Sequence, residues 1–483
     1  ALGLTVVSSA NWKDPLSNDN YCAPLNILNF NASVSSYDTD QMTGASDIGS
    51  NAINDTNFVG DEEGISELPW FIGSNGTIDD SLCSAKTVSS LGAVLGLCPE
   101  APTMKGGYQM AGVAYHAHTN KIRSDLTVPS NDNQSLKVST YGIALATNVP
   151  KIDIPVPGST SNQKITILPA YRLDRSSNGS GPFGGGTLVD FKIVCQITSD
   201  ATSDTINSVR SQSNGLCDAA GTGAFYANWE DSEQGGDYDQ DMWGVIKYRI
   251  SSNSISVTTD AVSASTSNGQ GFGYVISGTD KDGPHFHSGI YNFDYTDPVP
   301  VTVRNTNGTV LNGSGEINTS GGCTNCVVSD PATVVTYDIG QSTAGVLKDP
   351  LWYAAKWGGF KEDRNDSQNP PNNLPDLARE WDSKKADGTA GSDGIPDNYF
   401  YVVNPSDLEN SLNKAFIQIL ESSSASSVAT NSTSLQSGSR IYQAQFNSRL
   451  WSGKLLSFKI DSTTGRIITP EEWDAGVDLT KQL

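Results

Sequence analysis

The sequence predicts a multidomain α+β protein with a partial α/β region, a large β-rich insertion and a terminal β-hairpin. Three observations support this fold class. The chain has 483 residues, enough for roughly three domains of about 150 residues each. A strand, a helix and a strand follow one another early in the chain, and the composition then changes to short alternating runs rich in Ser, Thr, Asn and Gly. We therefore divide the chain into residues 1–148, 149–345, 346–435 and 436–483.

The first segment has the order expected of a parallel sheet. Residues 25–30 (LNILNF) and 138–145 (VSTYGIAL) are short runs typical of strands. Between them, residues 111–122 carry an apolar stripe at helical spacing. The stripe consists of Ala111, Ala114, Tyr115, His118 and Ile122. Strand, helix and strand in this order favour parallel pairing of the two strands.

The second segment has the pattern of an all-β insertion. Residues 254–258 and 301–304 are short alternating runs, separated from others by Gly- and Asn-rich turns. Residues 176–181 and the glycine run 184–186 have the composition of flexible connectors.

The last two segments contain a helix and a hairpin. Ser406-Asp407-Leu408-Glu409 is a capping-box pattern, which predicts a helix start. An apolar stripe follows it, formed by Leu408, Leu412, Ala415, Phe416 and Ile419. Residues 422–439 are a Ser/Ala/Thr tract that we interpret as a linker. Residues 441–446 and 454–460 then predict two strands, and a two-stranded hairpin is marginal alone in water. We therefore expect it to begin a larger β-domain.

The charge balance excludes two classes of partner. Lys and Arg number 30 against 53 Asp and Glu, a formal net charge of −23 at pH 7. Such a field repels phosphate backbones and anionic lipid surfaces, so we expect neither nucleic-acid binding nor membrane-surface binding. We expect no membrane insertion, because no run approaches the roughly 20 apolar residues of a membrane helix. The first residues lack a leader pattern, so we expect any signal peptide to be already removed.

Seven cysteines in polar surroundings indicate an exported protein, where disulfides persist. Local pairing suggests three disulfides: Cys83 with Cys98, Cys195 with Cys217, and Cys323 with Cys326. Cys22 remains without a predicted partner. Half a zinc site is the alternative for Cys323 and Cys326, but no second Cys or His pair follows at a suitable spacing.

Several blocks of the chain are specific enough to indicate a family. They are residues 347–360 (LKDPLWYAAKWGGF), 394–400 (GIPDNYF), 451–455 (WSGKL), 235–244 (GGDYDQDMWG) and 271–279 (GFGYVISGT). Together they resemble the PilY family of type IV pilus tip adhesins and pilus-biogenesis factors, from about residue 21 to the end.

The resemblance implies a von Willebrand A-like region, a characteristic middle and a C-terminal β-propeller. By it, residues 1–148 would be a partial or degenerate von Willebrand A-like region. Residues 346–435 would be an aromatic, helix-containing junction, and residues 436–483 the first strands of a propeller that is mostly absent. A von Willebrand A metal site needs an Asp-x-Ser-x-Ser loop, which this sequence lacks, so no ion-binding residues are transferred.

Two acidic stretches are candidate calcium sites. The first contains Asp382, Asp387, Asp393 and Asp397. Short carboxylates followed by glycine suit a hard cation that takes six to eight oxygens. The alternative is a simple turn, since Asp-Gly is a common turn dipeptide and Lys384 and Lys385 stand where a standard loop offers oxygen.

The second acidic stretch is Asp237, Asp239 and Asp241, at the 1-3-5 spacing of an EF-hand. It lacks glycine at the sixth position and has Tyr248 where the twelfth position requires Glu. On a strand the three carboxylates would share one face, an arrangement that favours either a bound cation or wide solvent exposure.

All four histidines form His-x-His pairs, His116/His118 and His285/His287. The first pair lies in the predicted helix, where the two rings diverge. On a strand, as expected for the second pair, both rings point the same way, as a transition-metal site requires. Surface or hydrogen-bonded histidine is the default interpretation for that pair, and a metal site is the alternative.

A dense aromatic stretch has two interpretations, core packing at a domain junction or a carbohydrate platform. Its members are Trp352, Tyr353, Trp357, Phe360, Trp381, Tyr399 and Phe400. Core packing is favoured because each ring buries a large apolar area. No Gly-x-Ser-x-Gly, Gly-x-x-x-x-Gly-Lys or His-Glu-x-x-His motif occurs, so we expect no enzyme.

The resemblance implies an exported, non-catalytic protein at the tip of a type IV pilus. It would support pilus assembly and surface adhesion, with minor pilins and a host or abiotic receptor as partners and Ca²⁺ as a candidate cofactor. The alternative is a secreted glycan-binding or glycan-hydrolysing protein with no attachment to a pilus.

Overall fold

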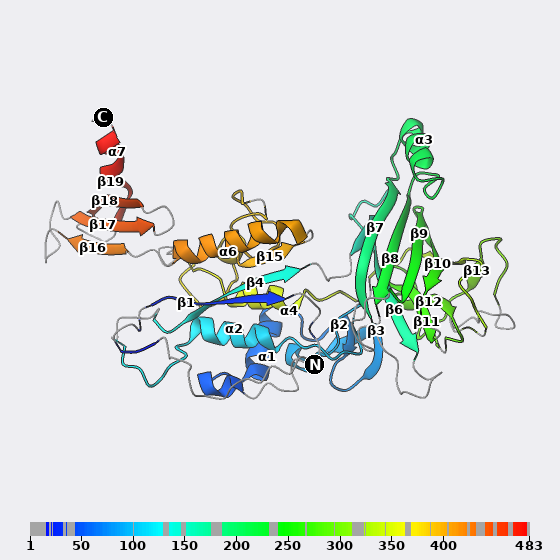
Figure 1. Cartoon of the computed structure of the whole chain (residues 1–483), viewed down its shortest axis with the longest axis horizontal. Coiled ribbons are helices and arrows are strands. Elements are labelled where there is room, and N and C mark those ends of the chain that lie inside the picture. The colour runs from blue at the N-terminus through cyan, green and yellow to red at the C-terminus, as the bar shows by residue number, and fades with distance from the viewer. Residues whose placement is uncertain are drawn as a thin grey trace.

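The fold of the chain was analysed in a computed structural model. It describes residues 16–18, 21, 23–31, 35, 44–99, 101–128, 135–145, 151–174, 186–230, 240–265, 268–293, 295–311, 323, 325–342, 344–362, 369–386, 388–402, 405–422, 426–430, 440–447, 452–461 and 467–480. Figure 1 shows a parallel sheet with helices in the middle of the view, a tall group of antiparallel strands at the right and a small sheet at the left. The predicted mixed α+β, multidomain class is confirmed, and so are its parallel sheet and the β-rich middle segment.

The parallel sheet has three strands in the order β1-β4-β15. They are β1 (Leu25–Asn31), β4 (Val138–Leu145) and β15 (Tyr399–Val402). β1 pairs with β4 in parallel, Leu25 opposite Val138, as the sequence predicts. β15 comes from the 346–435 segment and pairs in parallel with β4, Tyr399 opposite Gly142. The first and third segments of the chain therefore share one sheet, although the sequence division separates them.

Helices cover both faces of this sheet, as parallel sheets require. One face packs against α2 (Gln109–Thr119) and α4 (Pro350–Trp357), and the other against α6 (Leu408–Ser422). Helix α1 (Ala52–Glu62) packs against α2. The alternation along β4 separates the two cores, since Ala144 joins the cluster around α2 and α4 while Ile143 joins Ala415 of α6. Among the predicted stripe of α6, Phe416 remains 50% exposed.

Helix α4 is buried along its whole length. Asp349 caps it by accepting a hydrogen bond from Leu351 N at 2.8 Å, and Pro350 occupies the first turn, where no N–H is needed. All eight residues of α4 are buried, and a Cβ at Gly142 would lie 2.7 Å from Leu351 Cγ. Glycine on β4 therefore allows the helix to pack closely on the sheet.

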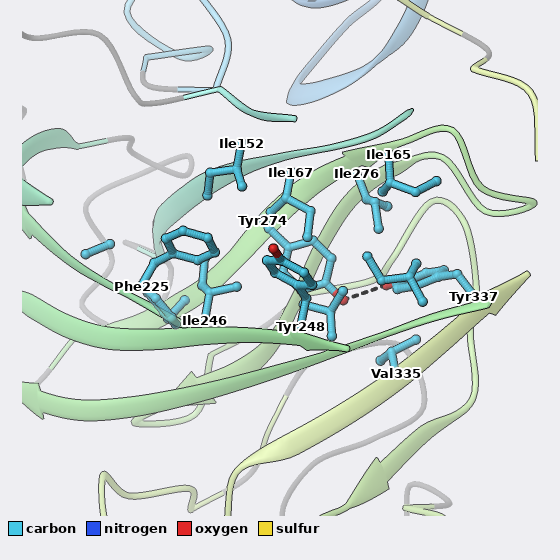
Figure 2. Close-up of a cluster of buried hydrophobic side chains, with 14 of the residues drawn as sticks. Ile152, Ile165, Ile167, Phe225, Ile246, Tyr248, Tyr274, Ile276, Val335 and Tyr337 are labelled. Carbon is cyan, nitrogen blue, oxygen red and sulfur yellow. Dashed lines mark hydrogen bonds between the residues drawn. The ribbon is translucent and has the colours of Figure 1, made fainter. Parts of the chain in front are cut away.

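The β-rich segment forms two facing antiparallel sheets. The larger has the order β13-β14-β10-β9-β8-β7 and the smaller the order β12-β11-β6-β5. Their bounds are β5 (Ile152–Pro155), β6 (Lys164–Asp174), β7 (Thr187–Ile197), β8 (Thr222–Glu230), β9 (Met242–Ile250), β10 (Ser254–Ala264), β11 (Gly269–Ser277), β12 (Gly283–Ile290), β13 (Val303–Asn305) and β14 (Thr333–Asp338). Figure 2 shows apolar side chains of both sheets meeting between them, among them Ile167, Ile246 and Val335.

The remaining elements lie outside the parallel sheet and the β-sandwich. They are the hairpin β2 (Leu68–Ser74) and β3 (Asp79–Val88), helix α3 (Ser203–Gln212), the short helix α5 (Ala378–Trp381), β16 (Ser426–Thr430), β17 (Arg440–Asn447), β18 (Ser452–Ile460), β19 (Ile467–Asp474), α7 (Ala475–Thr480), and the 3-10 turns Gly44–Ile48, Leu91–Ala93 and Pro405–Asp407. The strands β16 to β19 form one antiparallel sheet in sequence order.

The structure corrects the linker prediction. Residues 426–430 of the expected linker form strand β16, which pairs with β17 from Ser426 opposite Gln445 to Thr430 opposite Ile441. The terminal hairpin is therefore part of a four-stranded sheet, and its neighbours supply the pairing that two strands lack. The helix start predicted at the capping box is confirmed: Ser406 and Asp407 lie in a 3-10 turn, and the α-helix begins at Leu408. The connectors 176–181 and 184–185 lie outside the described residues.

The buried cap of α4 gives a pH test. Burial raises the pKa of Asp349 to about 6, whereas an unfolded chain has a value of about 3.9. The folded state therefore binds this proton more readily, so this group adds stability as the pH falls from about 6 towards 4. Asp349→Asn keeps a side-chain oxygen for Leu351 N and removes the charge. At pH 7.5 the variant should gain roughly 3 kcal/mol in free energy of unfolding, and near pH 4 most of this gain should vanish.

Urea denaturation of both proteins at the two pH values measures this difference. An equal difference at pH 7.5 and pH 4 would show that Asp349 carries no cost of buried charge.

Candidate metal centre

A cluster of two histidines and one aspartate lies inside the β-sandwich. Strand β12 carries His285 and His287 on the same face, as its alternation predicts, and that face points between the two sheets. Opposite it, Tyr274 of β11 pairs with His285, and the register shifts between Phe272 and Tyr274. At this shift a Cβ on Gly273 would lie 1.9 Å from His285 O, so only glycine allows β11 and β12 to approach here.

Asp297 completes the cluster from the connection that leaves β12. Its Oδ2 lies 2.8 Å from His285 Nδ1 and 3.5 Å from His287 Nε2. Its Oδ1 accepts a hydrogen bond from Val299 N at 2.8 Å, which fixes the carboxylate across Pro298. The three side chains are 0%, 1% and 0% exposed, so the group is shut off from solvent.

The two histidines differ in how their nitrogens are satisfied. The other ring nitrogen of His285, Nε2, lies 2.9 Å from Lys281 O, so both of its nitrogens face acceptors. His287 has no hydrogen-bond partner among the described residues at either Nδ1 or Nε2. Burial and the neighbouring His285 ring lower the pKa of His287 well below its usual value, which keeps the ring neutral. A neutral imidazole offers a lone pair, the form that binds metal.

Two tyrosines line the same interior. Tyr274 and Tyr337 share a hydrogen bond of 2.7 Å between their hydroxyl groups, drawn in Figure 2. Burial raises the pKa of both phenols, and the charge of Asp297 adds to the rise. Both hydroxyls therefore remain protonated beside the cluster.

The donor set indicates the class of ion that fits. The three ligand atoms lie within 4.8 Å of one another, and no other group of three such donors occurs in the described part of the chain. Imidazole nitrogens suit zinc, copper, nickel and iron, whereas calcium takes oxygen ligands. The group therefore fits a transition metal rather than the Ca²⁺ predicted from the acidic stretches.

The sequence contains only half of this signal. The spacing of His285 and His287 predicts two rings on one side of a strand, which the structure confirms. Asp297 was missed, because an aspartate before a proline is typical of a turn and its approach to β12 depends on the fold.

The other histidine pair lies on helix α2, as predicted. Both nitrogens of His118 have backbone carbonyls beside them, Val138 O at 3.1 Å and Phe360 O at 2.9 Å. His116 lies 3.4 Å from Asp55 and 3.1 Å from Ile48 O. Each ring thus has its own set of neighbours, and this pair forms no metal group among the residues described.

The first acidic loop is closed by backbone hydrogen bonds. Asp382 accepts from Gly394 N at 2.7 Å and Asp393 N at 3.0 Å. Asp393 accepts from Ala386 N and Ile395 N, and Asp397 accepts from Lys384 N at 2.9 Å and Ser383 Oγ at 2.6 Å. These contacts have the geometry of the turn alternative. The calcium prediction remains untested, and Asp387 lies outside the described residues.

The second acidic stretch is described only at its end. Asp241 is buried, with Ser265 Oγ 3.3 Å from its carboxylate. Asp237 and Asp239 lie outside the described residues, so the second calcium prediction also remains untested.

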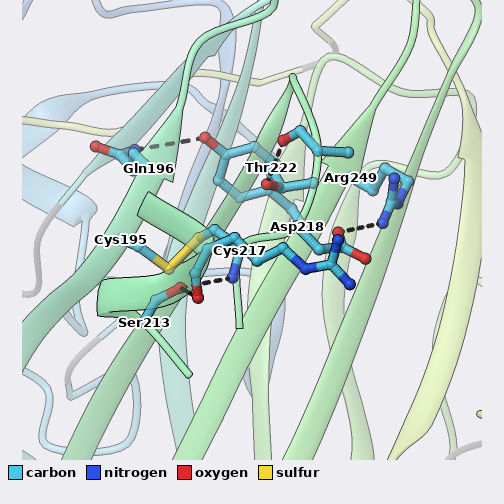
Figure 3. The surroundings of a disulfide bond; sticks show 10 residues. Cys195, Gln196, Ser213, Cys217, Asp218, Thr222 and Arg249 are labelled. Atoms are coloured by element: carbon cyan, nitrogen blue, oxygen red, sulfur yellow. Dashed lines mark hydrogen bonds and ion pairs between the residues drawn. A yellow bond between two sulfur atoms is a disulfide. The ribbon is translucent and has the colours of Figure 1, made fainter. Parts of the chain in front are cut away.

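Two of the predicted disulfides are present, Cys83–Cys98 and Cys195–Cys217. Figure 3 shows the second, which joins β7 to the segment after α3. Ser213 Oγ accepts a hydrogen bond from Cys217 N beside it, and Arg249 forms an ion pair of 2.5 Å with Asp218. The bond thus ties α3 to the edge strand of the larger sheet.

The third predicted pair differs. Cys323 and Cys326 are buried free cysteines rather than a disulfide. A hydrogen bond with Cys326 lowers the pKa of the Cys323 thiol, more than burial raises it. Asn325 between them has a left-handed φ of 58°, so a tight turn brings the thiols together without a bond. Cys22 lies outside the described residues.

The aromatic stretch forms core, as favoured from the sequence. Trp352, Tyr353, Trp357, Phe360 and Tyr399 are all buried. Lys356 crosses this cluster with its ammonium group 4.3 Å from the centre of the Trp381 ring and 2.7 Å from Glu63.

Two regions of the sequence match models of known protein families. Residues 3–117 match a family model described as PilY1 homolog, second domain, and residues 159–319 match one described as PilY1 homolog, beta-sandwich. These are domains of pilus-biogenesis proteins. Two regions of the chain thus match domain models of the PilY1 homologue family, and the resemblance seen in its sequence is confirmed.

Relatives of the same description extend the match. A type IV pilus biogenesis factor PilY1 homologue of Xylella fastidiosa (strain Temecula1 / ATCC 700964) is 27% identical over 429 residues, 84% of this chain and 26% of the relative. A second such homologue from the same organism is 29% identical over 133 residues, 27% of this chain and 11% of the relative. The chain therefore spans about a quarter of the length of the first relative, and its match to the second covers 11% of that protein. No solved structure matches the chain.

None of the helices in the described ranges has the length and apolar character needed to cross a membrane.

The state of the cysteines can be measured by alkylation. In the folded protein, Cys323 and Cys326 should resist iodoacetamide because they are buried. After unfolding without reductant both should react, whereas the four cysteines of the two disulfides should react only after reduction. Peptide mass spectrometry reads out each site. Protection of Cys323 and Cys326 in the unfolded, unreduced protein would restore the disulfide predicted from the sequence.

Proposed function

We propose that this chain is part of an exported type IV pilus-biogenesis factor that acts at the filament tip. The observation that carries the proposal is the match of two separate regions to PilY1-homologue domains, together with 27% identity to one such factor over 84% of the chain. In this proposal the chain supports pilus assembly and surface adhesion through protein contacts, with minor pilins and a surface receptor as partners.

Two features of the chain support export and a function that depends on protein–protein contacts. Two disulfides stiffen it, and such bonds persist outside the cytoplasm. The net charge of −23 favours solubility at high local concentration.

The finer domain assignments belong to the same proposal. The three parallel strands with helices on both faces suit a partial von Willebrand A-like region. The antiparallel sheet β16-β17-β18-β19 has the strand number of one propeller blade, which suits the start of a propeller.

The alternative, a free glycan-binding or glycan-hydrolysing protein, loses its main support. The aromatic side chains that would form a carbohydrate platform are largely buried in the core between α4, α2 and the sheet. A buried ring cannot stack on a sugar. We therefore propose that the chain has no catalytic role.

Co-purification with filaments tests the proposal. The full-length protein that contains this chain should be tagged in a strain that makes pili, the filaments sheared off, and the fraction captured through the tag. We expect minor pilins in the captured fraction, and the same capture from a strain without minor pilins should yield the tagged protein alone. Deletion of the gene should reduce surface pili and adhesion, and the wild-type gene should restore both.

The proposal would be wrong if the protein stayed in the culture medium and captured no filament subunits, and if piliation stayed normal in the deletion strain. Polysaccharide turnover by the purified chain, lost on changing one carboxylate, would favour the glycan alternative.

A further inference from the structure

We propose that His285 Nδ1, His287 Nε2 and Asp297 Oδ2 bind one transition-metal ion of the zinc class inside the β-sandwich. This site is distinct from the acidic loops and is independent of the role at the pilus. Its ion is structural, because all three ligands are at most 1% exposed to solvent.

The first argument is the state of His287. A buried side-chain nitrogen almost always has a partner in a folded protein, yet both nitrogens of this ring have none among the described residues. The ring is 1% exposed, and an apolar side chain could be buried there without leaving a polar atom unsatisfied. A zinc ion bound to Nε2 at the typical zinc–nitrogen distance of about 2.0–2.1 Å would supply the missing partner.

The second argument is the geometry of the other two ligands. Ligand atoms around a tetrahedral zinc ion lie about 3.3 Å apart. Asp297 Oδ2 lies 2.8 Å from His285 Nδ1 and 3.5 Å from His287 Nε2, so a small shift of the carboxylate opens the required space. The fourth position is left to water or a further polar group.

The third argument is the support around the ligands. Metal-bound histidine usually donates its other N–H to a carbonyl or carboxylate. His285 Nε2 lies 2.9 Å from Lys281 O, which holds that ring with Nδ1 turned to the site. Asp297 Oδ1 is held by Val299 N, which leaves Oδ2 for the ion.

The position of Asp297 indicates what the ion does. The connection that carries this residue leads from β12 of the smaller sheet to β13 of the larger one. Binding by two residues of β12 and one of this crossover joins the crossover to the strand that precedes it. The metal therefore fixes the start of the crossover against β12.

The test measures metal content and stability of the purified chain. After stripping with a chelator, the protein is loaded with Zn²⁺, dialysed, and analysed by mass spectrometry for metal. We expect about one equivalent of zinc and a rise in Tm of several degrees, while Ca²⁺ causes no such rise through this site. Zinc at background level in the wild type would overturn the proposal.

Two variants separate a metal ligand from a packing residue. His287→Leu removes the unpartnered ring, so the metal-free variant should melt at or above the Tm of the metal-free wild type. The variant should also lose the bound zinc and the rise in Tm that zinc causes. His116→Gln is the matched control: it changes one histidine of the other pair and should keep both. Equal zinc content in wild type and His287→Leu would overturn the proposal.

A spectroscopic measurement covers the case in which His287→Leu fails to fold. Co²⁺ added to the wild-type chain in place of zinc should give the visible absorption bands of a low-coordinate nitrogen and oxygen site, and Zn²⁺ should remove them. Absence of such bands, or bands that persist in zinc excess, would leave the cluster as a buried hydrogen-bonded group only.

Discussion

The architecture depends on the pairing of β4 with β15, which precede and follow the whole β-sandwich in the sequence. β15 joins the parallel sheet only after the chain has completed the sandwich and returned, and Asn398 Nδ2 donates to Thr140 O at 3.1 Å across a sequence separation of 258 residues. Closing a loop of this length costs about 5 kcal/mol in chain entropy if the loop is flexible. The folded sandwich removes much of that flexibility, so the two ends return to the sheet at a smaller cost.

Several contacts offset what remains of that cost. Thr140 N donates to Gly358 O at 2.7 Å, Gly142 N donates to Asn398 O at 2.9 Å, and α4 buries all eight of its residues against the same sheet. The region before the sandwich therefore lacks a complete core without the region after it. The sandwich is an insertion in an α/β unit and not simply the second of four consecutive domains.

Strand β12 links the two units through its alternation. Its outward residue Phe286 packs with Phe71 of the β2–β3 hairpin and Cys83, which is bonded to Cys98. Its inward neighbours His285 and His287 face the other sheet of the sandwich. Because both faces of β12 are buried, a movement of this strand disturbs the hairpin and the sandwich together.

The local patterns of the sequence predicted β1, β4, α2, β17 and β18 closely, since each shows its own periodicity. The start of α4 also carried a signal, Asp349 followed by Pro350, but its apolar residues surround the helix and give no stripe. Pairing of β15 with β4 and the approach of Asp297 to His285 depend on contacts distant in sequence, which no local pattern encodes. In the acidic loop, Asp382 and Asp397 accept backbone N–H groups, contacts that their spacing in the sequence does not reveal, and the calcium site there stays a prediction.

The four histidines show why burial alone does not identify a site. His118 is half-buried, and a backbone carbonyl group lies beside each of its two nitrogens. His285 is likewise satisfied by Lys281 O and Asp297. His287 differs because its buried ring has no hydrogen-bond partner in the part of the chain that the structure describes. Such a state costs about 1–3 kcal/mol for each unsatisfied group. An apolar residue would remove that cost, so the polar ring at this position is best explained by a ligand that binds it.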